Sequence, residues 1–207
     1  ALKLKNTYPK IANIFGLTPH DALKITNEEY QSLEKAAKNK KIHAVGEIGL
    51  DYFYHNASKK EQIQLFKQQL GIAKKHKLPV VIHVRDAFND LFQIMDQADI
   101  QTPVVIHCFT GNLNEANEIL KRKWYLSFSG IITFKKSTDL QKIAEKIPLT
   151  SLLIETDSPF LAPVPKRGKE NIPSYIRYTA EFLSELKKVS IEEAAKATSE
   201  NALKIFF

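Results

Sequence analysis

The chain has 207 residues, of which 43% are hydrophobic, and it carries a formal net charge of +7. Its single cysteine, Cys108, excludes an internal disulfide and suits a reducing compartment. No apolar run reaches the length of a membrane span, and the N-terminus has no apolar signal segment. Without a linker, a repeat or a low-complexity tract, we expect one cytoplasmic domain over residues 1–207.

Apolar segments recur along the chain and are expected to form strands. Four of them are continuously apolar, which is typical of strands buried on both faces of a parallel sheet. The six expected strands lie within residues 11–15, 42–51, 79–85, 103–107, 125–132 and 152–157.

Segments with helical spacing of apolar residues lie between these strands. Ser58 and Glu61 form a capping box at the start of a helix that runs up to Lys77. Further helical segments are expected over residues 88–95, 113–120 and 140–147. Strands that alternate with helices predict an α/β fold with a parallel sheet. The long irregular stretch over residues 163–173 is typical of a functional loop.

Four of the apolar runs carry a residue that could bind a metal ion: Glu47, His83, His107 and Asp157. One histidine at a strand end is more often a hydrogen-bonded core residue, but four such endings together indicate a site. Catalytic residues at the ends of several strands favour a (β/α) barrel, whereas an open sheet gathers its ligand at one switch point. The chain is shorter than the typical barrel of about 250 residues.

The ligand types limit the metal. A ligand set of imidazole and carboxylate suits Zn²⁺ or Mn²⁺ best and also suits Fe or Co²⁺. A set made of carboxylates alone would indicate Mg²⁺. We expect one or two divalent ions of Zn²⁺, Mn²⁺ or Mg²⁺. Glu47 is the candidate to bridge two ions that activate water and assist displacement at phosphorus.

The basic charge favours a polyanionic partner such as nucleic acid, although most of it is lysine, which commonly covers solvated helix faces. Arg85 and Arg167 are more specific candidates, because guanidinium binds phosphate in a bidentate manner. Strand alternation would point Arg85 and His83 to the same side. His20 could reach the site, but its neighbours Pro19 and Asp21 are equally explained by a turn and a helix start.

Four ordered motifs resemble those of the TatD family of metal-dependent deoxyribonucleases: residues 46–51, 81–87, 106–111 and 155–159. The resemblance spans essentially the whole chain and implies a TIM-barrel hydrolase of the amidohydrolase type. It implies that Glu47, His83 and His107 hold one metal, that Glu47 also serves a second, and that Asp157 serves the second metal and the attacking water. Residues 167–173 match the family's substrate-side loop, so Arg167 and Asn171 are expected to contact the substrate.

The sequence departs from the family pattern in two places. It contains no His-x-His pair, and it has Thr18 where the family usually has a histidine. We therefore expect a barrel that lacks its first two strands, with one metal bound well, a second bound poorly, and slow cleavage.

The resemblance predicts cleavage of phosphodiester bonds in DNA, by trimming of single-stranded or frayed ends. Two alternatives stay open: hydrolysis of a small amide or phosphoester by the same residues, and a catalytically impaired remnant that binds nucleic acid or metal.

Overall fold

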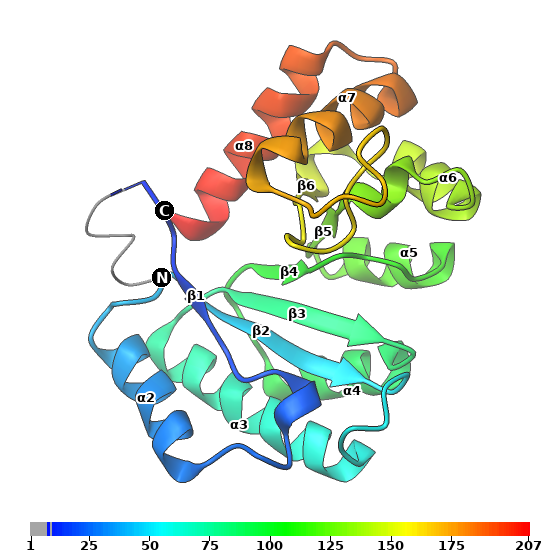
Figure 1. Cartoon of the computed structure of the whole chain (residues 1–207). Coiled ribbons are helices and arrows are strands. Elements are labelled where there is room, and N and C mark those ends of the chain that lie inside the picture. Colours follow the sequence, from blue (N-terminus) through cyan, green and yellow to red (C-terminus); the bar gives the residue numbers. More distant parts are fainter. Residues whose placement is uncertain (1–7, 9) are drawn as a thin grey trace. The chain divides into compact units, whose positions relative to one another are not determined.

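The structure is a computed structural model that describes Tyr8 and residues 10–207. It has an α/β fold whose residues group into two compact units, Ala1–Val105 with Ile205–Phe207, and Ile106–Lys204 (Figure 1). The expectation of one domain over the whole chain remains a prediction. None of the described helices is long and apolar enough to cross a membrane.

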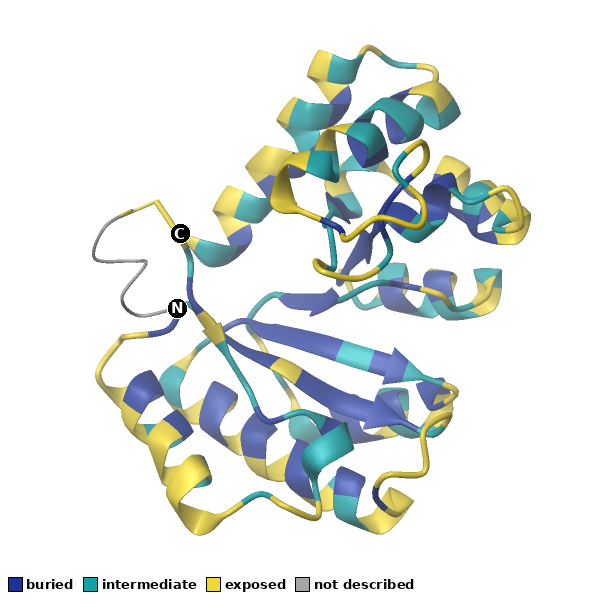
Figure 2. Cartoon of the chain, in the orientation of Figure 1, coloured by how far each residue is buried: buried dark blue, intermediate teal, exposed yellow. Residues whose placement is uncertain are grey.

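The first unit is built on parallel strands, as predicted. They are β1 (Ile14–Phe15), β2 (Ala44–Asp51) and β3 (Val80–Arg85), and β4 (Val104–Ile106) begins in this unit. Figure 2 shows β2 and β3 as almost continuously buried, which explains their apolar sequences. β1 is shorter than predicted, because the chain forms a turn at its start, where the backbone N–H of Ile11 donates to the carbonyl of Tyr8 at 3.0 Å.

Three helices of the first unit follow its strands in sequence order. They are α2 (Asn27–Lys38), α3 (Lys59–His76) and α4 (Phe88–Ala98), with a short 3-10 helix η1 (Pro19–Asp21) before them. The predicted capping box of α3 is confirmed, because Ser58 and Glu61 each accept a backbone N–H of the other. α2 was missed, although Thr26 and Glu29 form the same kind of box.

The second unit contains the parallel strands β5 (Tyr125–Phe128) and β6 (Leu152–Ile154). Its helices are α5 (Leu113–Lys121), α6 (Thr138–Lys146), α7 (Ile176–Lys187) and most of α8 (Ile191–Phe206), with 3-10 helices η2 (Gly130–Thr133), η3 (Leu149–Ser151) and η4 (Pro173–Tyr175). The strand predicted through Ile132 is wrong beyond Phe128. There the chain turns into η2, in which Thr133 Oγ1 donates to the carbonyl of Gly130 at 2.7 Å.

Gly49 allows β2 and β3 to approach each other where the candidate ligands lie. Its φ is +150°, and a Cβ atom there would lie 1.9 Å from the carbonyl oxygen of His83. We expect Gly49→Ala to lower the free energy of unfolding by roughly 2–5 kcal/mol, because both the backbone conformation and the contact are unfavourable. Chemical denaturation of the purified variant would measure this.

Gly71 in α3 is the matched control, because a Cβ atom at that position meets no atom within 4 Å. Gly71→Ala should stabilise the protein by about 0.5–1 kcal/mol, as expected for alanine within a helix. Equal stability of Gly49→Ala and the wild-type protein would show that the strands can separate without cost.

Candidate metal centre

Glu47 lies in the middle of β2 and not at its end, as the sequence had suggested. The strand continues to Asp51, because the register with β3 resumes after an irregularity between Val45 and Ile48 and extends to Asp51 opposite Arg85. Glu47 is exposed, whereas every other residue of β2 is buried. An exposed carboxylate within an otherwise buried strand is suited to bind a ligand or an ion.

Asp51 and His83 form a close polar pair in the first unit. Asp51 Oδ2 lies 2.8 Å from Nε2 of His83, and the Asp51 side chain is fully buried. Asp51 Oδ1 accepts the backbone N–H groups of Phe53 and Tyr54 at 2.9 and 3.0 Å. A carboxylate on one ring nitrogen fixes the orientation of a histidine and directs the other nitrogen toward a metal. His83 would therefore bind an ion through Nδ1.

The pKa of Asp51 reflects two opposing causes. Burial favours the protonated form and raises the pKa, but the hydrogen bonds from the Tyr54 N–H and from His83 outweigh it, helped by the nearby charge of His83 and His20. The net result is a lowered pKa. Asp51 therefore acts as a hydrogen-bond acceptor for the groups around it.

His20 lies next to this pair, and its segment forms the predicted turn, while its place in a functional site remains a prediction. Thr18 Oγ1 accepts the N–H of His20 at 3.0 Å at the start of η1, while His20 Nε2 lies 3.7 Å from Asp51 Oδ2. Single ligand atoms of His20, Asp51 and His83 all lie within 4.8 Å of one another. The three residues thus form one polar group within the first unit.

The second unit repeats the pairing of a histidine with a carboxylate. His107 directly follows β4, and its Nδ1 lies 2.8 Å from Glu155 Oε1. His107 Nε2 lies 3.6 Å from Asp157 Oδ1, and Ser127 Oγ donates to Glu155 Oε2 at 2.5 Å. Glu155 thus lies on the Nδ1 side of the ring and Asp157 on the Nε2 side.

Sequence analysis did not identify Asp51 or Glu155 as functional residues. Each lies at or just after the end of a strand and could have been noticed there, but an acidic residue at that position is equally typical of a turn. Cys108 is partly exposed, and its Sγ lies 3.1 Å from the hydroxyl oxygen of Ser129.

The pairing of His107 with Glu155 leads to a prediction about metal affinity. Glu155→Gln should weaken the binding of Zn²⁺ or Mn²⁺ by about 10- to 100-fold, as is typical when the partner of a ligating histidine is removed. Isothermal titration calorimetry would measure the change. Glu170→Gln is the control, because Glu170 is an exposed residue of the 163–173 loop. Unchanged affinity in Glu155→Gln would mean that Glu155 does not orient a ligand.

The two arginines predicted to bind phosphate both stack on aromatic rings. The guanidinium of Arg85 lies 3.6 Å from the ring centroid of Phe53, and that of Arg167 lies 3.7 Å from that of Phe134. Among the described residues, no carboxylate forms an ion pair with either arginine. Stacking fixes the guanidinium plane and leaves its N–H edge available for an anion.

Asn171 has a different environment from the one predicted. It is only 2% exposed, and its side-chain amide donates to the carbonyls of Thr156 and Phe160, both at 2.6 Å. Residues 163–172 contain no helix or strand, as predicted for this loop, but β6 ends at Ile154, so the strand predicted through Asp157 is wrong beyond that residue. Asn171 thus stabilises the loop that follows β6 by hydrogen bonds to its backbone. Direct contact of Asn171 with a substrate remains a prediction.

The donor types fit a divalent metal. His83 and His107 offer imidazole nitrogens, and Glu47 and Asp157 offer carboxylate oxygens. Both ligand types suit Zn²⁺ or Mn²⁺. The candidate ligands are distributed over both units, with Glu47 and His83 in the first and His107 and Asp157 in the second.

A family model described as TatD related DNase matches residues 1–207. The uncharacterized metal-dependent hydrolase YabD of Bacillus subtilis is 40% identical over 207 residues, which are 100% of this chain and 81% of YabD. The uncharacterized metal-dependent hydrolase YcfH of Escherichia coli is 40% identical over 183 residues, which are 87% of this chain and 69% of YcfH.

Solved structures show the same fold. The crystal structure of YjjV, a TatD homologue from Escherichia coli, superposes with a TM-score of 0.92 at 30% identity and covers 99% of this chain and 80% of YjjV. A phosphotriesterase homology protein from Escherichia coli gives a TM-score of 0.66 at 12% identity, covers 100% of this chain and 78% of that protein, and is similar in fold alone. These comparisons confirm the predicted α/β fold of the TIM-barrel class.

Proposed function

The chain belongs to the TatD family of metal-dependent hydrolases, and we propose that it hydrolyses phosphodiester bonds of DNA. The observation that supports a phosphate substrate most strongly is Arg85. This arginine lies two residues after His83 on β3, is stacked on Phe53, and has no carboxylate partner among the described residues. A guanidinium held in this way is suited to bind a phosphate group beside a metal ligand.

We propose that Glu47, His83 and His107 hold one divalent ion and that Glu47 and Asp157 hold a second when two are bound. Zn²⁺, Mn²⁺ and Mg²⁺ are the candidate ions. When bound, such ions polarise the phosphodiester, lower the pKa of water and stabilise the leaving oxygen.

The residues of the chain have separate roles in this proposal. Arg85 and Arg167 bind the phosphate groups and fix the strand, while Asp157 accepts the proton of the attacking water. The oxygen of this water forms a bond to phosphorus, and the P–O bond to the leaving nucleotide breaks. Asp51 and Glu155 hold His83 and His107 in place, and His20 lies beside Asp51, where it could contact the same substrate.

We further propose that cleavage proceeds from the ends of the DNA, on single-stranded or frayed segments. The test is to incubate the purified chain with an end-labelled single-stranded oligonucleotide, the matching blunt duplex, and a small uncharged ester, each with Zn²⁺, Mn²⁺ or Mg²⁺. Stepwise shortening of the single strand that stops when the ion is chelated is the expected result. Hydrolysis of the small ester without any cleavage of DNA would favour a small-molecule hydrolase instead.

Arg85→Ala separates phosphate recognition from the chemical step. We expect it to lower kcat/KM for the oligonucleotide by about 10- to 100-fold, because a charge-assisted hydrogen bond to phosphate is lost. Turnover of the small uncharged ester should change little. Arg122→Ala is the matched control, because Arg122 pairs with Glu118 on α5 and is not a candidate for substrate binding. Equal losses on both substrates would indicate that Arg85 has a structural role.

A further inference from the structure

Two adjacent aromatic residues, Phe53 and Tyr54, are exposed in the segment that follows β2. Their exposed fractions are 50% and 49%, and their rings pack edge to face with centroids 5.0 Å apart. Scattered exposed apolar side chains are normal on a protein surface, but a packed pair beside candidate catalytic residues requires a specific explanation.

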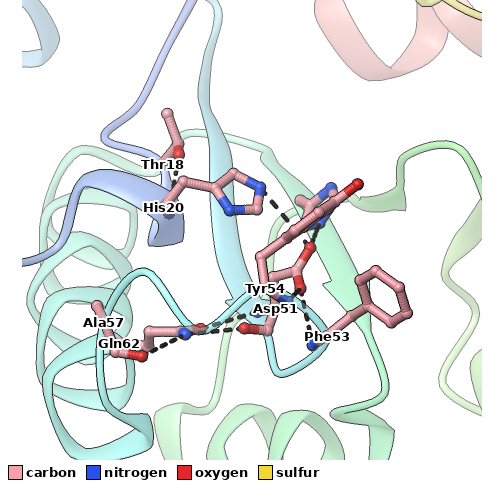
Figure 3. Close-up of polar contacts among 8 residues, drawn as sticks. Thr18, His20, Asp51, Phe53, Tyr54, Ala57 and Gln62 are labelled. Atoms are coloured by element: carbon pink, nitrogen blue, oxygen red, sulfur yellow. Dashed lines mark hydrogen bonds and ion pairs between the residues drawn. The ribbon is translucent and has the colours of Figure 1, made fainter.

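The position of this pair is fixed by the same carboxylate that orients His83. Asp51 Oδ1 accepts the backbone N–H groups of both aromatic residues, while its Oδ2 contacts His83 (Figure 3). The ring of Tyr54 also packs edge to face against that of His20, with centroids 5.5 Å apart. The two rings are therefore held at a defined place next to the candidate ligand.

Cations lie against these aromatic rings. The guanidinium of Arg85 lies 3.6 Å from the centroid of Phe53 and 5.3 Å from that of Tyr54. Lys59 Nζ lies 4.3 Å from the centroid of the ring of Tyr52, which precedes Phe53 in the chain. Aromatic rings interleaved with cations are the usual means by which proteins bind single-stranded nucleic acid, because bases stack on the rings and phosphates meet the cations.

Beside Tyr54 the surface is hollowed. The hollow has a volume of about 470 Å³, which is in the range of small-molecule sites. Its lining combines apolar and hydrogen-bonding side chains, among them Leu23, Tyr54, His55, Asn56 and Lys59. Such a surface can accommodate a flat, polar-edged group next to the Tyr54 ring.

We propose that Phe53 and Tyr54 form a stacking platform for an unpaired base of single-stranded DNA and that Arg85 meets the adjoining phosphate. This inference rests on the proposed function and names its substrate: a strand whose terminal bases are not paired. A base within a duplex is covered on both faces by its neighbours and is paired along its edge, whereas a single-stranded or frayed end offers the platform bases that are free to stack. The platform thereby selects single-stranded ends over duplex DNA.

The test measures binding without turnover. A fluorescent single-stranded oligonucleotide is titrated with the protein in the presence of a chelator, and its anisotropy is followed. Because stacking on one aromatic ring contributes about 1–3 kcal/mol per base, the double variant Phe53→Ala/Tyr54→Ala should bind about 5- to 100-fold more weakly. Phe53→Trp should preserve the affinity, and Phe53→Leu, which is apolar but has no ring, should not.

Phe207→Ala is the matched control, because Phe207 is 66% exposed in the same unit and contacts His43, just before the start of β2. Its affinity should equal that of the wild-type protein. A second series of oligonucleotides carries an abasic site at one terminal position at a time. One abasic position should weaken binding to the wild-type protein and have little further effect on the double variant.

The outcomes separate this inference from the proposed function. The platform would be overturned, even if the protein cleaves DNA, by either of two results. The double variant binds the oligonucleotide as tightly as the wild-type protein does, or no abasic site weakens binding to the wild-type protein. Binding that depends on both the rings and one base, in a protein that cleaves no DNA with any of the three metals, would support the platform and contradict the nuclease. Absence of any wild-type binding to the oligonucleotide would overturn the platform as well.

Discussion

Glu47→Gln is expected to lower hydrolysis of an oligonucleotide by about 10³-fold, because it removes the proposed bridging carboxylate and roughly 4 kcal/mol of transition-state stabilisation. Glu47 is the one exposed residue of β2, and glutamine has nearly the same size and shape as glutamate. The fold should therefore stay intact, and the loss should appear in catalysis and in metal binding. Steady-state kinetics combined with a metal titration would measure both.

The control for this prediction is Glu28→Gln, at an exposed glutamate in the first turn of α2. It removes the same charge from the protein and should leave both quantities unchanged. If Glu47→Gln binds metal and cleaves DNA as well as the wild-type protein, Glu47 is neither a metal ligand nor a catalytic residue.

Asp51→Ala is expected to lower the free energy of unfolding of the metal-free protein by roughly 2–5 kcal/mol, because it removes a buried side chain and leaves the backbone N–H groups of Phe53 and Tyr54, and also His83, without their acceptor. The affinity for metal should fall by about 10- to 100-fold as well, since His83 loses the group that orients it. Thermal denaturation and calorimetric titration would measure the two effects.

Asp51→Asn is the companion variant, because its side-chain oxygen can still accept the N–H groups of Phe53 and Tyr54. It should be more stable than Asp51→Ala but should bind metal more weakly than the wild-type protein.

The fold lowers the pKa of Asp51 below its ordinary value of 3.8. The stability that the charge of Asp51 contributes is therefore complete above pH 3.8 and is lost as the pH falls further. The stabilities of wild-type and Asp51→Asn should therefore converge in acid. A constant difference across this range would show that the charge of Asp51 does not contribute.

The strands were predictable because they are buried on both faces, so that runs such as the one ending at Arg85 are apolar in sequence. Three helices were missed. The buried face of α2, which Leu33 and Ala36 form, is hard to recognise among the surrounding lysines. α7 and α8 follow the last predicted strand, so the alternation of strands and helices did not predict them. The end of β5 was misplaced because Ile131 and Ile132 continue an apolar run into a 3-10 helix.

The candidate site was predictable only in part. Candidate ligands such as His83 and His107 are visible in sequence, because each lies in or directly after an apolar run and such residues recur in four runs of the chain. Their carboxylate partners were not visible, because Asp51 and Glu155 acquire that role from distances of 2.8 Å that only the fold creates. The stacking of Arg85 on Phe53 depends likewise on the turn after β2, whose geometry the sequence did not predict.

The most direct test of the central claim is anomalous diffraction from crystals of the protein grown with Zn²⁺ or Mn²⁺, recorded on both sides of the absorption edge of the metal. The proposal predicts an anomalous peak at about 2.0–2.2 Å from ligand atoms of Glu47, His83 and His107. A second, weaker peak would lie beside Asp157. A metal peak whose ligands include none of these residues, or no peak from a protein that hydrolyses DNA, would contradict the assignment.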